Sequence, residues 1–283
     1  CPITSCRISG NLWRKNMLQT SDKWVRMGHT RAMEDCGMKI KYKDIMKLPE
    51  SLNHPMVSGY IVEAGTEAHC TNLLTGIFGC DVKEAMKEEY EQNFLALNEE
   101  DQKKVFAEFE DNVQSVNLYT DMIDFEPIAM QEWVNFKLDG IDRPGSGKLD
   151  LRAMRNGRMG IIDWKRVITK SKPQPKAGYK LQLALYALHT MKKYKLEEIP
   201  WVENHIFQPG GKKPTIMRHE ITAEDIYEAV YRQRNLNHRL EMGYFPLNRQ
   251  SYLCKPNFCA YYERCHFENF ETLDELVNGI TIQ

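Results

Sequence analysis

The sequence has no long apolar run, since no stretch approaches the roughly 18 residues that a membrane-spanning helix needs. It also has no excess of charge of one sign, because 38 lysine and arginine residues face 39 acidic ones and the formal net charge is −1. A polyanionic partner would therefore have to be met by a local basic patch. The opening segment CPITSCRISG does not have the pattern of a signal peptide.

A complete phosphate-binding loop is missing as well. Residues 145–148 read Gly-Ser-Gly-Lys, but Leu149 follows the lysine where the nucleotide-binding pattern requires Ser or Thr. This excludes an NTPase of that type, and no internal repeat is visible. What the chain does have is an ordinary globular composition, 42% hydrophobic and 27% charged over 283 residues. That is enough for a packed core in one large domain or two modest ones.

The eight cysteines are unevenly distributed. Five are scattered, and three lie close together near the end of the chain, at Cys254, Cys259 and Cys265. In a large chain without a secretion signal, a local triplet favours ligation of a metal or a cluster over a disulfide framework. The alternative is three reduced cysteines that pack a C-terminal cap.

The hydrophobic period divides the chain into helical and extended parts. Helical spacing is expected up to about residue 50, over 58–79 with Gly79 as its end, and in two amphipathic helices between 81 and 122. The period then changes to two over 128–140, 147–157 and 158–167, and the pair Asn156-Gly157 predicts a hairpin between the last two strands. A helix over 179–194, a hairpin over 202–222 and a helix that ends at Gly243 follow. This order predicts an α/β fold (an α+β sandwich) in which helices flank a central mixed sheet.

Two acids and a lysine stand near the predicted hairpin. Asp150 precedes the turn and Asp163 follows it, so strand pairing could bring the two carboxylates together at one end of the sheet. Lys165 is two residues after Asp163 and therefore points to the same face. Two carboxylates in a poorly solvated site repel each other, and a divalent cation such as Mg²⁺ or Mn²⁺ would relieve that repulsion. The alternative is a surface ion pair at a strand end.

The order of these residues resembles the PD-(D/E)xK nuclease superfamily, specifically its RecB-like and phage-exonuclease branch. The segments that carry the resemblance are GTEAH with His69, GKLD with Asp150, GIIDWK with Asp163 and Lys165, and QLALY with Gln182 and Tyr186. The match runs from about Gly65 to Tyr186. It implies a restriction-endonuclease-like sheet flanked by helices and a metal-dependent hydrolysis of phosphodiester bonds.

The resemblance also implies a role for each matched residue. His69, Asp150 and Asp163 would bind the metal together with the backbone carbonyl of Trp164. Lys165 would orient or activate the attacking water, Gln182 would position Lys165 or substrate, and Tyr186 would contact the DNA backbone. The alternatives are a core histidine at position 69 and a polar helix edge at Gln182 and Tyr186. Glu132 resembles the acid that family members often carry on the preceding strand, although a surface acid fits that position nearly as well.

The cysteine triplet resembles a family feature too. Some RecB-like nucleases end in Cys-x2-Cys-x5-Cys, which binds a [4Fe-4S] cluster together with one upstream cysteine, and this chain has Cys-x4-Cys-x5-Cys. By its distance from His69, Cys36 is the expected fourth ligand in preference to Cys6 and Cys1. A four-thiolate zinc site is the rival interpretation. Either would tie the N-terminal helices to the C-terminus.

Basic residues gather after the acid-x-lysine pair and are expected to contact phosphates, with Tyr179 available to stack on bases. The residues with this expectation are Arg152, Arg166, Lys170, Lys172, Lys176 and Tyr179. No base-reading motif is visible, so the backbone of DNA is the expected target. A solvated lysine-rich loop is the alternative interpretation.

The sequence thus predicts a Mg²⁺- or Mn²⁺-dependent DNA exonuclease that acts on single-stranded or duplex ends. The resemblance suggests recombination, repair or phage DNA processing in the cytoplasm of a bacterial or phage-infected cell, with a helicase or recombination protein as a partner. The alternatives are a structure-specific endonuclease and a non-catalytic nucleic-acid-binding subunit. The expected organisation is an N-terminal helical region (1–64), a nuclease core (65–245) with a helical insertion at about 81–122, and a cysteine-containing cap (246–283).

Overall fold

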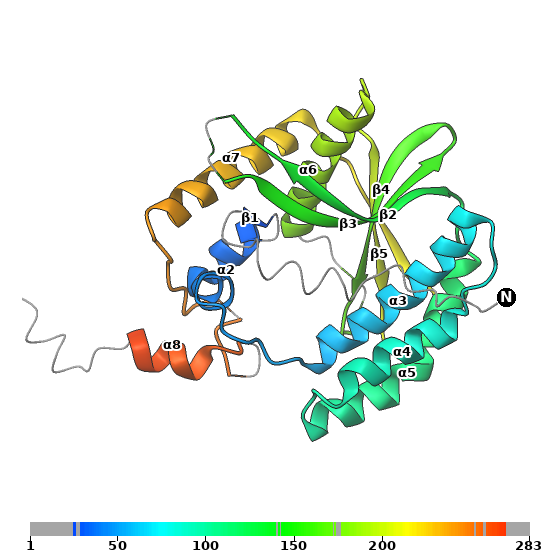
Figure 1. Cartoon of the computed structure of the whole chain (residues 1–283), viewed down its shortest axis with the longest axis horizontal. Coiled ribbons are helices and arrows are strands. Elements are labelled where there is room, and N and C mark those ends of the chain that lie inside the picture. Colours follow the sequence, from blue (N-terminus) through cyan, green and yellow to red (C-terminus); the bar gives the residue numbers. More distant parts are fainter. Residues whose placement is uncertain are drawn as a thin grey trace, which may run out of the picture.

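The computed structural model describes residues 25–26, 29–139, 141, 143–171, 173, 177–251, 253–256 and 259–269 (Figure 1). Along the chain the elements are β1 (Val25–Arg26), α2 (His29–Ile40), a π-helical segment η2 (Lys41–Ile45), α3 (His54–Thr75), α4 (Val82–Phe94), α5 (Glu99–Thr120), β2 (Glu126–Phe136), β3 (Gly145–Arg155), β4 (Arg158–Arg166), α6 (Ala177–Tyr194), β5 (Trp201–Phe207), β6 (Thr215–His219), α7 (Ala223–Glu241) and α8 (Tyr262–Asn269). No helix in these described ranges is long and apolar enough to cross a bilayer.

The strands form one mixed sheet in the order β1-β3-β4-β5-β6, and β2 pairs with β3 as well. β4 and β5 are parallel, whereas β2, β4 and β6 each run antiparallel to a neighbour. The β3–β4 hairpin turns at Asn156 and Gly157, whose φ angles of 52° and 74° are those that a two-residue hairpin turn requires. The predicted fold class and this predicted hairpin are therefore confirmed.

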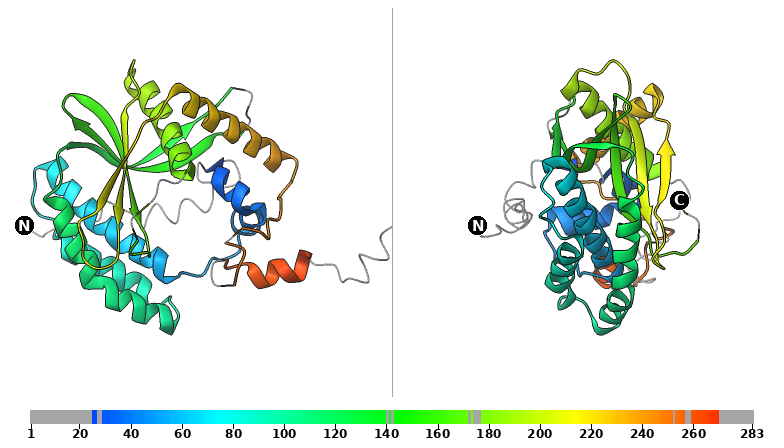
Figure 2. Two further views of the ribbon diagram at one scale, coloured as in Figure 1. Left: turned by 180° about the vertical axis from the view of Figure 1, so that it is seen from behind. Right: turned by 90° about the vertical axis from the view of Figure 1, so that its right-hand side faces the viewer.

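Helices cover both faces of the sheet (Figures 1 and 2). α3, α4 and α5 pack on one face and share a core with Ile162 and Trp164 of β4. α6 and α7 pack on the other face, in a core that includes Ile161 of the same strand. β4 is therefore buried on both sides, which explains why its sequence is apolar without alternation. Only glycine fits at position 160, because a Cβ there would meet the ring of Trp201 at 1.9 Å.

The first long helix differs from its predicted bounds. α3 begins at His54, where the side chain of Asn53 accepts a hydrogen bond from the Met56 amide, and it ends at Gly76, whose φ is 66°. Gly79 is therefore not its end, and the helix runs unbroken across the predicted boundary between residues 64 and 65. The two helices expected between 81 and 122 are present as α4 and α5.

The ends of the described chain meet away from the sheet. Met38 and Tyr42 form a small core with Tyr261 and Cys265, and the Tyr261 hydroxyl donates to the Leu48 carbonyl at 3.1 Å. The N-terminal helical segment and the segment around α8 are thus packed together.

Candidate active site

The two aspartates lie where strands β3 and β4 stop pairing. The pairing of these strands covers Leu151–Arg155 of β3, and its last pair is Leu151 with Ile162. Asp150 and Asp163 are the next residues on each strand, so they face each other where the sheet opens. The Trp164 amide donates to Oδ2 of Asp150 at 2.8 Å, which replaces a strand–strand hydrogen bond. The hairpin thus places the two carboxylates opposite each other, which is the arrangement that the sequence predicts.

Asp163 has two donors on one oxygen. The Nζ atom of Lys165 lies 2.5 Å from Asp163 Oδ2, and the Asn204 Nδ2 atom donates to the same Oδ2 at 2.7 Å. The Asp163 residue is only 2% exposed, whereas the Lys165 side chain keeps 27% of its surface. The lysine can therefore meet a substrate while the aspartate is held beneath it.

Burial and neighbouring charges together shift the pKa values of the site residues. Burial and the neighbouring Asp163 carboxylate raise the pKa of Asp150 well above its usual range, and Lys165 and the Trp164 amide offset this only in part. Burial alone would lower the pKa of Lys165, but the two carboxylates outweigh it and the pKa is raised. Lys165 is therefore a cation at neutral pH and acts by its charge and its hydrogen bonds.

Gln182 and Tyr186 lie one turn apart on α6 and contact each other. Gln182 Nε2 donates to the Tyr186 hydroxyl at 3.0 Å, and that hydroxyl donates to the Lys148 carbonyl at 2.7 Å. Burial raises the pKa of Tyr186, so the phenol stays protonated. Tyr186 is only 1% exposed, which contradicts its predicted contact with the DNA backbone. The pair instead braces β3 two residues before Asp150.

Glu63 of α3, which the sequence did not single out, acts on Asp150. The Glu63 charge contributes to the raised pKa of Asp150, and its Oε1 accepts from Gln131 Nε2 at 2.9 Å. His69 is half-buried, and burial lowers its pKa. Throughout the part of the chain that the structure describes, no three His, Cys, Asp or Glu side chains lie close enough together to hold a metal ion. The predicted set of His69, Asp150 and Asp163 is therefore not assembled.

The orientation of α3 explains this correction. His69 is one turn after Gly65 and shares its face of the helix. A Cβ at Gly65 would meet Met86 Sδ of α4 at 2.6 Å and Val116 Cγ1 of α5 at 3.2 Å, so that face packs against the neighbouring helices. Glu63 is six residues before His69, which places it about 120° away around the helix. Its sequence signal was the spacing of Glu63 and Glu67, which puts two acids on one face.

The oxygen donors of the site suit a hard divalent cation. Asp150 and Asp163 face each other, and the Glu63 charge adds to the burial and the Asp163 charge that raise the pKa of Asp150. Carboxylate oxygens of this kind are the ligands that Mg²⁺ and Mn²⁺ prefer. The chemistry of the donor set thus fits a divalent metal ion that the two aspartates would hold, and the Trp164 carbonyl remains a predicted ligand.

Comparison with known proteins identifies the family. A family model described as PD-(D/E)XK nuclease superfamily matches residues 28–266. The chain belongs to this superfamily.

A solved structure shows the same fold as this PD-(D/E)XK chain at low sequence identity. A protein from Eubacterium rectale, provisionally named an exonuclease, is 13% identical with a TM-score of 0.62, and the alignment covers 98% of this chain and 100% of that one. A second structure, that of SSO0001, is 10% identical over 90% of this chain and 96% of that one, with a TM-score of 0.41. No curated protein sequence matches the chain significantly.

Two arginines that were expected to bind DNA lie in the interior of this PD-(D/E)XK chain. Arg152 is 0% exposed, forms an ion pair with Glu132 and donates to Thr190 Oγ1 at 3.1 Å. The Arg166 side chain is 1% exposed and pairs with Glu108 at 2.8 Å. The prediction of phosphate contacts is wrong for both, because their guanidinium groups connect the sheet to the helices.

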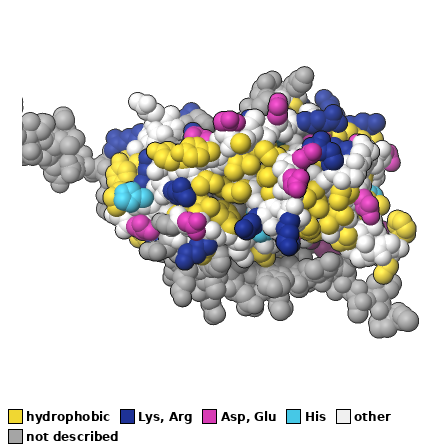
Figure 3. All heavy atoms as spheres, turned by 90° about the horizontal axis from the view of Figure 1, so that it is seen from above, with side chains coloured by type: hydrophobic (Ala, Val, Ile, Leu, Met, Phe, Trp, Pro, Cys, Tyr) yellow, Lys and Arg dark blue, Asp and Glu magenta, His cyan; other side chains and the backbone are white. Residues whose placement is uncertain are grey.

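The other predicted DNA contacts remain predictions. Lys170 is exposed and Tyr179 is half-buried, whereas Lys172 and Lys176 lie outside the described residues. On the face seen from above, basic and acidic side chains alternate over an apolar background, and no continuous basic tract is visible among the described residues there (Figure 3).

The predicted cysteine ligands are brought to one region. Cys36, Cys259 and Cys265 belong to the same small core, and Cys254 is near enough for its charge to act on Cys259 and Cys265. Burial raises the pKa of both Cys259 and Cys265. Within the described ranges no three of these thiols form a set that could hold a metal. Their ligation of a cluster or zinc remains a prediction.

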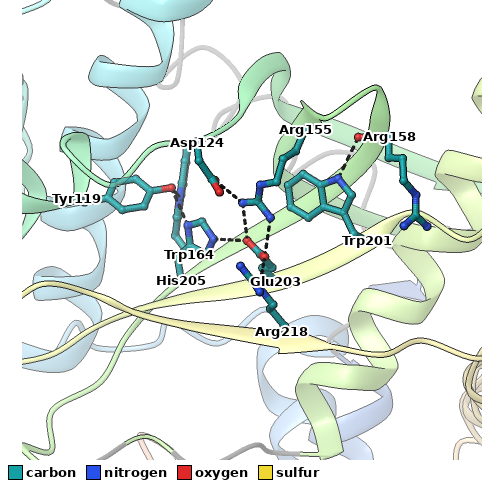
Figure 4. A network of polar contacts seen from close by, with 9 residues as sticks. All are labelled: Tyr119, Asp124, Arg155, Arg158, Trp164, Trp201, Glu203, His205 and Arg218. Carbon is teal, nitrogen blue, oxygen red and sulfur yellow. Dashed lines mark hydrogen bonds and ion pairs between the residues drawn. The ribbon is translucent and has the colours of Figure 1, made fainter.

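A second polar network lies on the opposite face of β5, a feature that sequence reasoning missed (Figure 4). Arg155 forms two hydrogen bonds to Glu203, at 2.8 and 3.0 Å, and His205 Nε2 lies 2.9 Å from the same carboxylate. The other ring nitrogen of His205 contacts the Tyr119 hydroxyl at 2.8 Å, which also accepts from the Trp164 indole at 3.1 Å. Glu203 and His205 flank Asn204, so the network fixes the strand residue that contacts Asp163.

Proposed function

We propose that this PD-(D/E)XK chain is a Mg²⁺- or Mn²⁺-dependent deoxyribonuclease that hydrolyses phosphodiester bonds at DNA ends. The observation that carries the proposal is the contact of Lys165 Nζ with Asp163 Oδ2 at 2.5 Å, beside an Asp150 whose pKa is raised by burial and by Asp163. A cation and two carboxylates at the open end of a sheet are the groups that phosphoryl hydrolysis requires.

Each residue has a distinct part in this proposal. Asp150 and Asp163 would hold the divalent metal, which when bound would polarise the phosphate and lower the pKa of a water molecule. Lys165, a cation at neutral pH, donates hydrogen bonds to the attacking water and stabilises the charge that develops on the phosphate oxygens. Gln182 and Tyr186 keep β3 in place through the Lys148 carbonyl. Glu63 adds negative charge beside Asp150 and so favours a cation there.

The preference for DNA ends is supported by the sequence and by a protein of the same fold. The sequence resembles the RecB-like and phage-exonuclease branch, and the Eubacterium rectale protein of the same fold carries an exonuclease name. Exposed Lys170 lies a few residues beyond β4 and Lys165, where it can contact a phosphate of the strand entering the site. A role in recombination, repair or phage DNA processing, with a helicase or recombination protein as partner, follows from the same resemblance.

We also propose that Cys36, Cys254, Cys259 and Cys265 bind a [4Fe-4S] cluster, with zinc as the rival. The support is that residues more than 200 positions apart in the chain come into one small core. Thiolate binding would require loss of the thiol protons, which burial opposes, so metal loading and folding of this region would be coupled. Anaerobic purification tests this proposal. A brown protein with iron and sulfide supports the cluster, and a protein with zinc alone supports the rival. A protein that contains neither metal overturns both interpretations.

The nuclease proposal is tested with end-labelled linear, circular and branched DNA over a titration of Mg²⁺ and Mn²⁺. Asp163→Asn and Lys165→Met are expected to abolish degradation of linear DNA while leaving DNA binding intact. Lys103→Met is the matched control, because this lysine side chain is 77% exposed on α5. Full activity of either site variant would overturn the proposal. Cleavage of circular or branched DNA by the unmodified protein would instead identify a structure-specific endonuclease.

A further inference from the structure

A chain of hydrogen bonds leads from Asp163 through two residues that the sequence did not single out. Asn204 Nδ2 donates to Asp163 Oδ2 at 2.7 Å, and Asn204 Oδ1 lies 2.7 Å from His219 Nε2. Asn204 belongs to β5 and is fully buried, whereas His219 is the last residue of β6 and is half-buried. The chain therefore runs from the buried carboxylate toward the edge of the sheet.

The direction of every hydrogen bond in this chain is fixed by chemistry. A carboxylate can only accept, so the NH₂ group of the Asn204 amide must face Asp163. The amide oxygen then faces His219, and an amide oxygen can only accept, so His219 Nε2 must carry a proton. Burial, and then the neighbouring Lys180, lower the pKa of His219, which keeps the ring neutral with its proton on Nε2.

The surrounding structure holds Asn204 in this position. Its neighbours Glu203 and His205 point to the other face of β5, where the Arg155, Tyr119 and Trp164 network binds them. Asn204 pairs with Asp163 in the parallel β4–β5 register, so the two side chains lie side by side on the face that carries α6. An asparagine buried this completely needs partners for its amide, and Asp163 and His219 supply them.

We propose that Asn204 and His219 are positioning residues of the active site, which hold the Asp163 carboxylate in one orientation for a divalent metal ion. The proposal rests on the nuclease function proposed above. Asn204 and Lys165 both occupy Oδ2 of Asp163, so Oδ1 is the oxygen that is left for the metal. His219 acts through Asn204, because it fixes which way the amide faces. Partners of this kind, one shell away from a ligand, tune both affinity and geometry.

The test compares Mn²⁺ binding by the full-length protein in titration calorimetry, without DNA, for the unmodified chain and four variants. Asn204→Leu and His219→Phe remove the donors at similar volume, and each is expected to weaken Mn²⁺ binding by about 10- to 100-fold. His219→Gln keeps an N–H donor that can reach the Asn204 oxygen, and it is expected to bind nearly as tightly as the unmodified protein. The double variant Asn204→Leu/His219→Phe is expected to bind Mn²⁺ with the same affinity as Asn204→Leu alone, because His219 acts only through Asn204.

Several outcomes would overturn the inference. Undiminished Mn²⁺ binding by a folded Asn204→Leu protein would do so, and so would equal weakening by His219→Gln and His219→Phe, which would indicate packing alone. Circular dichroism and thermal unfolding check that each variant folds. If Asn204→Leu does not fold, the comparison of the two His219 variants decides. Absence of Mn²⁺ binding by the unmodified protein would overturn the proposed function and this inference with it. If the unmodified protein binds Mn²⁺ and the variants bind it equally well, the inference alone is overturned.

Discussion

The backbone amide of Trp164 donates to the side chain of Asp150, 2.8 Å away, at the point where β3 and β4 separate. In a continuing hairpin this amide would bond to the facing strand. Its use by a side chain shows that the fork in the sheet and the position of the Asp150 carboxylate depend on each other. The Trp164 side chain is meanwhile buried under α5, so one residue connects the core to the site.

Asp150→Asn is expected to reduce metal-dependent DNA cleavage by more than the roughly 100-fold that loss of an outer partner costs. The same change should stabilise the protein without metal, because the pKa of Asp150 is raised and its charged form therefore opposes folding at neutral pH. Thermal unfolding in chelator at pH 8 and pH 5 checks this. The melting temperature of the variant should exceed that of the unmodified protein at pH 8. This difference should shrink at pH 5, because the charged form of the carboxyl is less favoured as the pH falls. A variant that is less stable at pH 8 would contradict the prediction.

The contributions of Glu63 and His69 to the site can be tested separately. Glu63→Gln should lower cleavage and weaken Mn²⁺ binding, because the Glu63 charge acts on Asp150. His69→Gln should leave both close to those of the unmodified protein, since its helix face packs toward α4 and α5. Cleavage rates over a Mn²⁺ titration measure the two effects, and the two variants are controls for each other. The reverse result would restore the role that the sequence resemblance implied for His69.

Glu203 predicts how stability depends on pH. Burial works to raise its pKa, but the hydrogen bonds from His205 and Arg155 outweigh it and lower the pKa to about 2 from an ordinary 4.5. A carboxyl with a lowered folded-state pKa stabilises the fold above its unfolded pKa, and this contribution is lost as the pH falls from about 4.5 toward 2. Its size is about 3 kcal/mol at most.

The corresponding measurement is urea unfolding of the unmodified protein and of Glu203→Gln at pH 7 and pH 3. The free energy of unfolding should be lower for the variant at pH 7, and the difference should narrow at pH 3. A difference that is constant over this range would show that the charge of Glu203 is not what stabilises the network. Glu198→Gln is a suitable control, because the Glu198 side chain is 77% exposed.

Substitutions at Arg152 and Lys170 should affect different properties, the first the stability of the fold and the second the affinity for DNA. Arg152→Met leaves the Glu132 carboxylate with only the more exposed Lys193 as its partner, so the free energy of unfolding should fall by about 1 to 3 kcal/mol. DNA affinity of the folded variant should not change. Lys170→Met should leave stability unchanged and reduce the slope of log affinity against log salt by about 1, as expected for one lost phosphate contact. An altered salt slope for Arg152→Met would show that the buried arginine reaches DNA after all.

Local pattern was sufficient for the elements that form the site. The change of period from helical to two marks the strands, and Asn156-Gly157 requires the positive φ angles that close the hairpin. Because strand pairing is then set by the turn, Asp150 and Asp163 had to face each other, and the two-residue spacing put Lys165 beside Asp163. These inferences need no knowledge of the rest of the chain.

Helix rotation was not available from local pattern. α3 carries glutamates and a histidine within seven residues, and which of them meets Asp150 depends on how closely α4 and α5 approach Gly65. The burial of Arg152 and Arg166 likewise depends on carboxylates from distant elements, at Glu132 and Glu108. A basic segment in sequence therefore gave no reliable indication of a basic surface.

The sequence by itself determined the order of strands and helices, the position of the two aspartates across a hairpin and the lysine beside them, because these follow from residue period and turn geometry. The tertiary structure decided that Glu63 acts on Asp150, that two arginines lie in the interior, that Cys36 packs in one small core with Cys259 and Cys265, and that Asn204 and His219 form a hydrogen-bonded chain to Asp163. The physical reason is that each of these contacts joins residues far apart in the chain, whose meeting depends on the packing of whole elements and not on any local pattern.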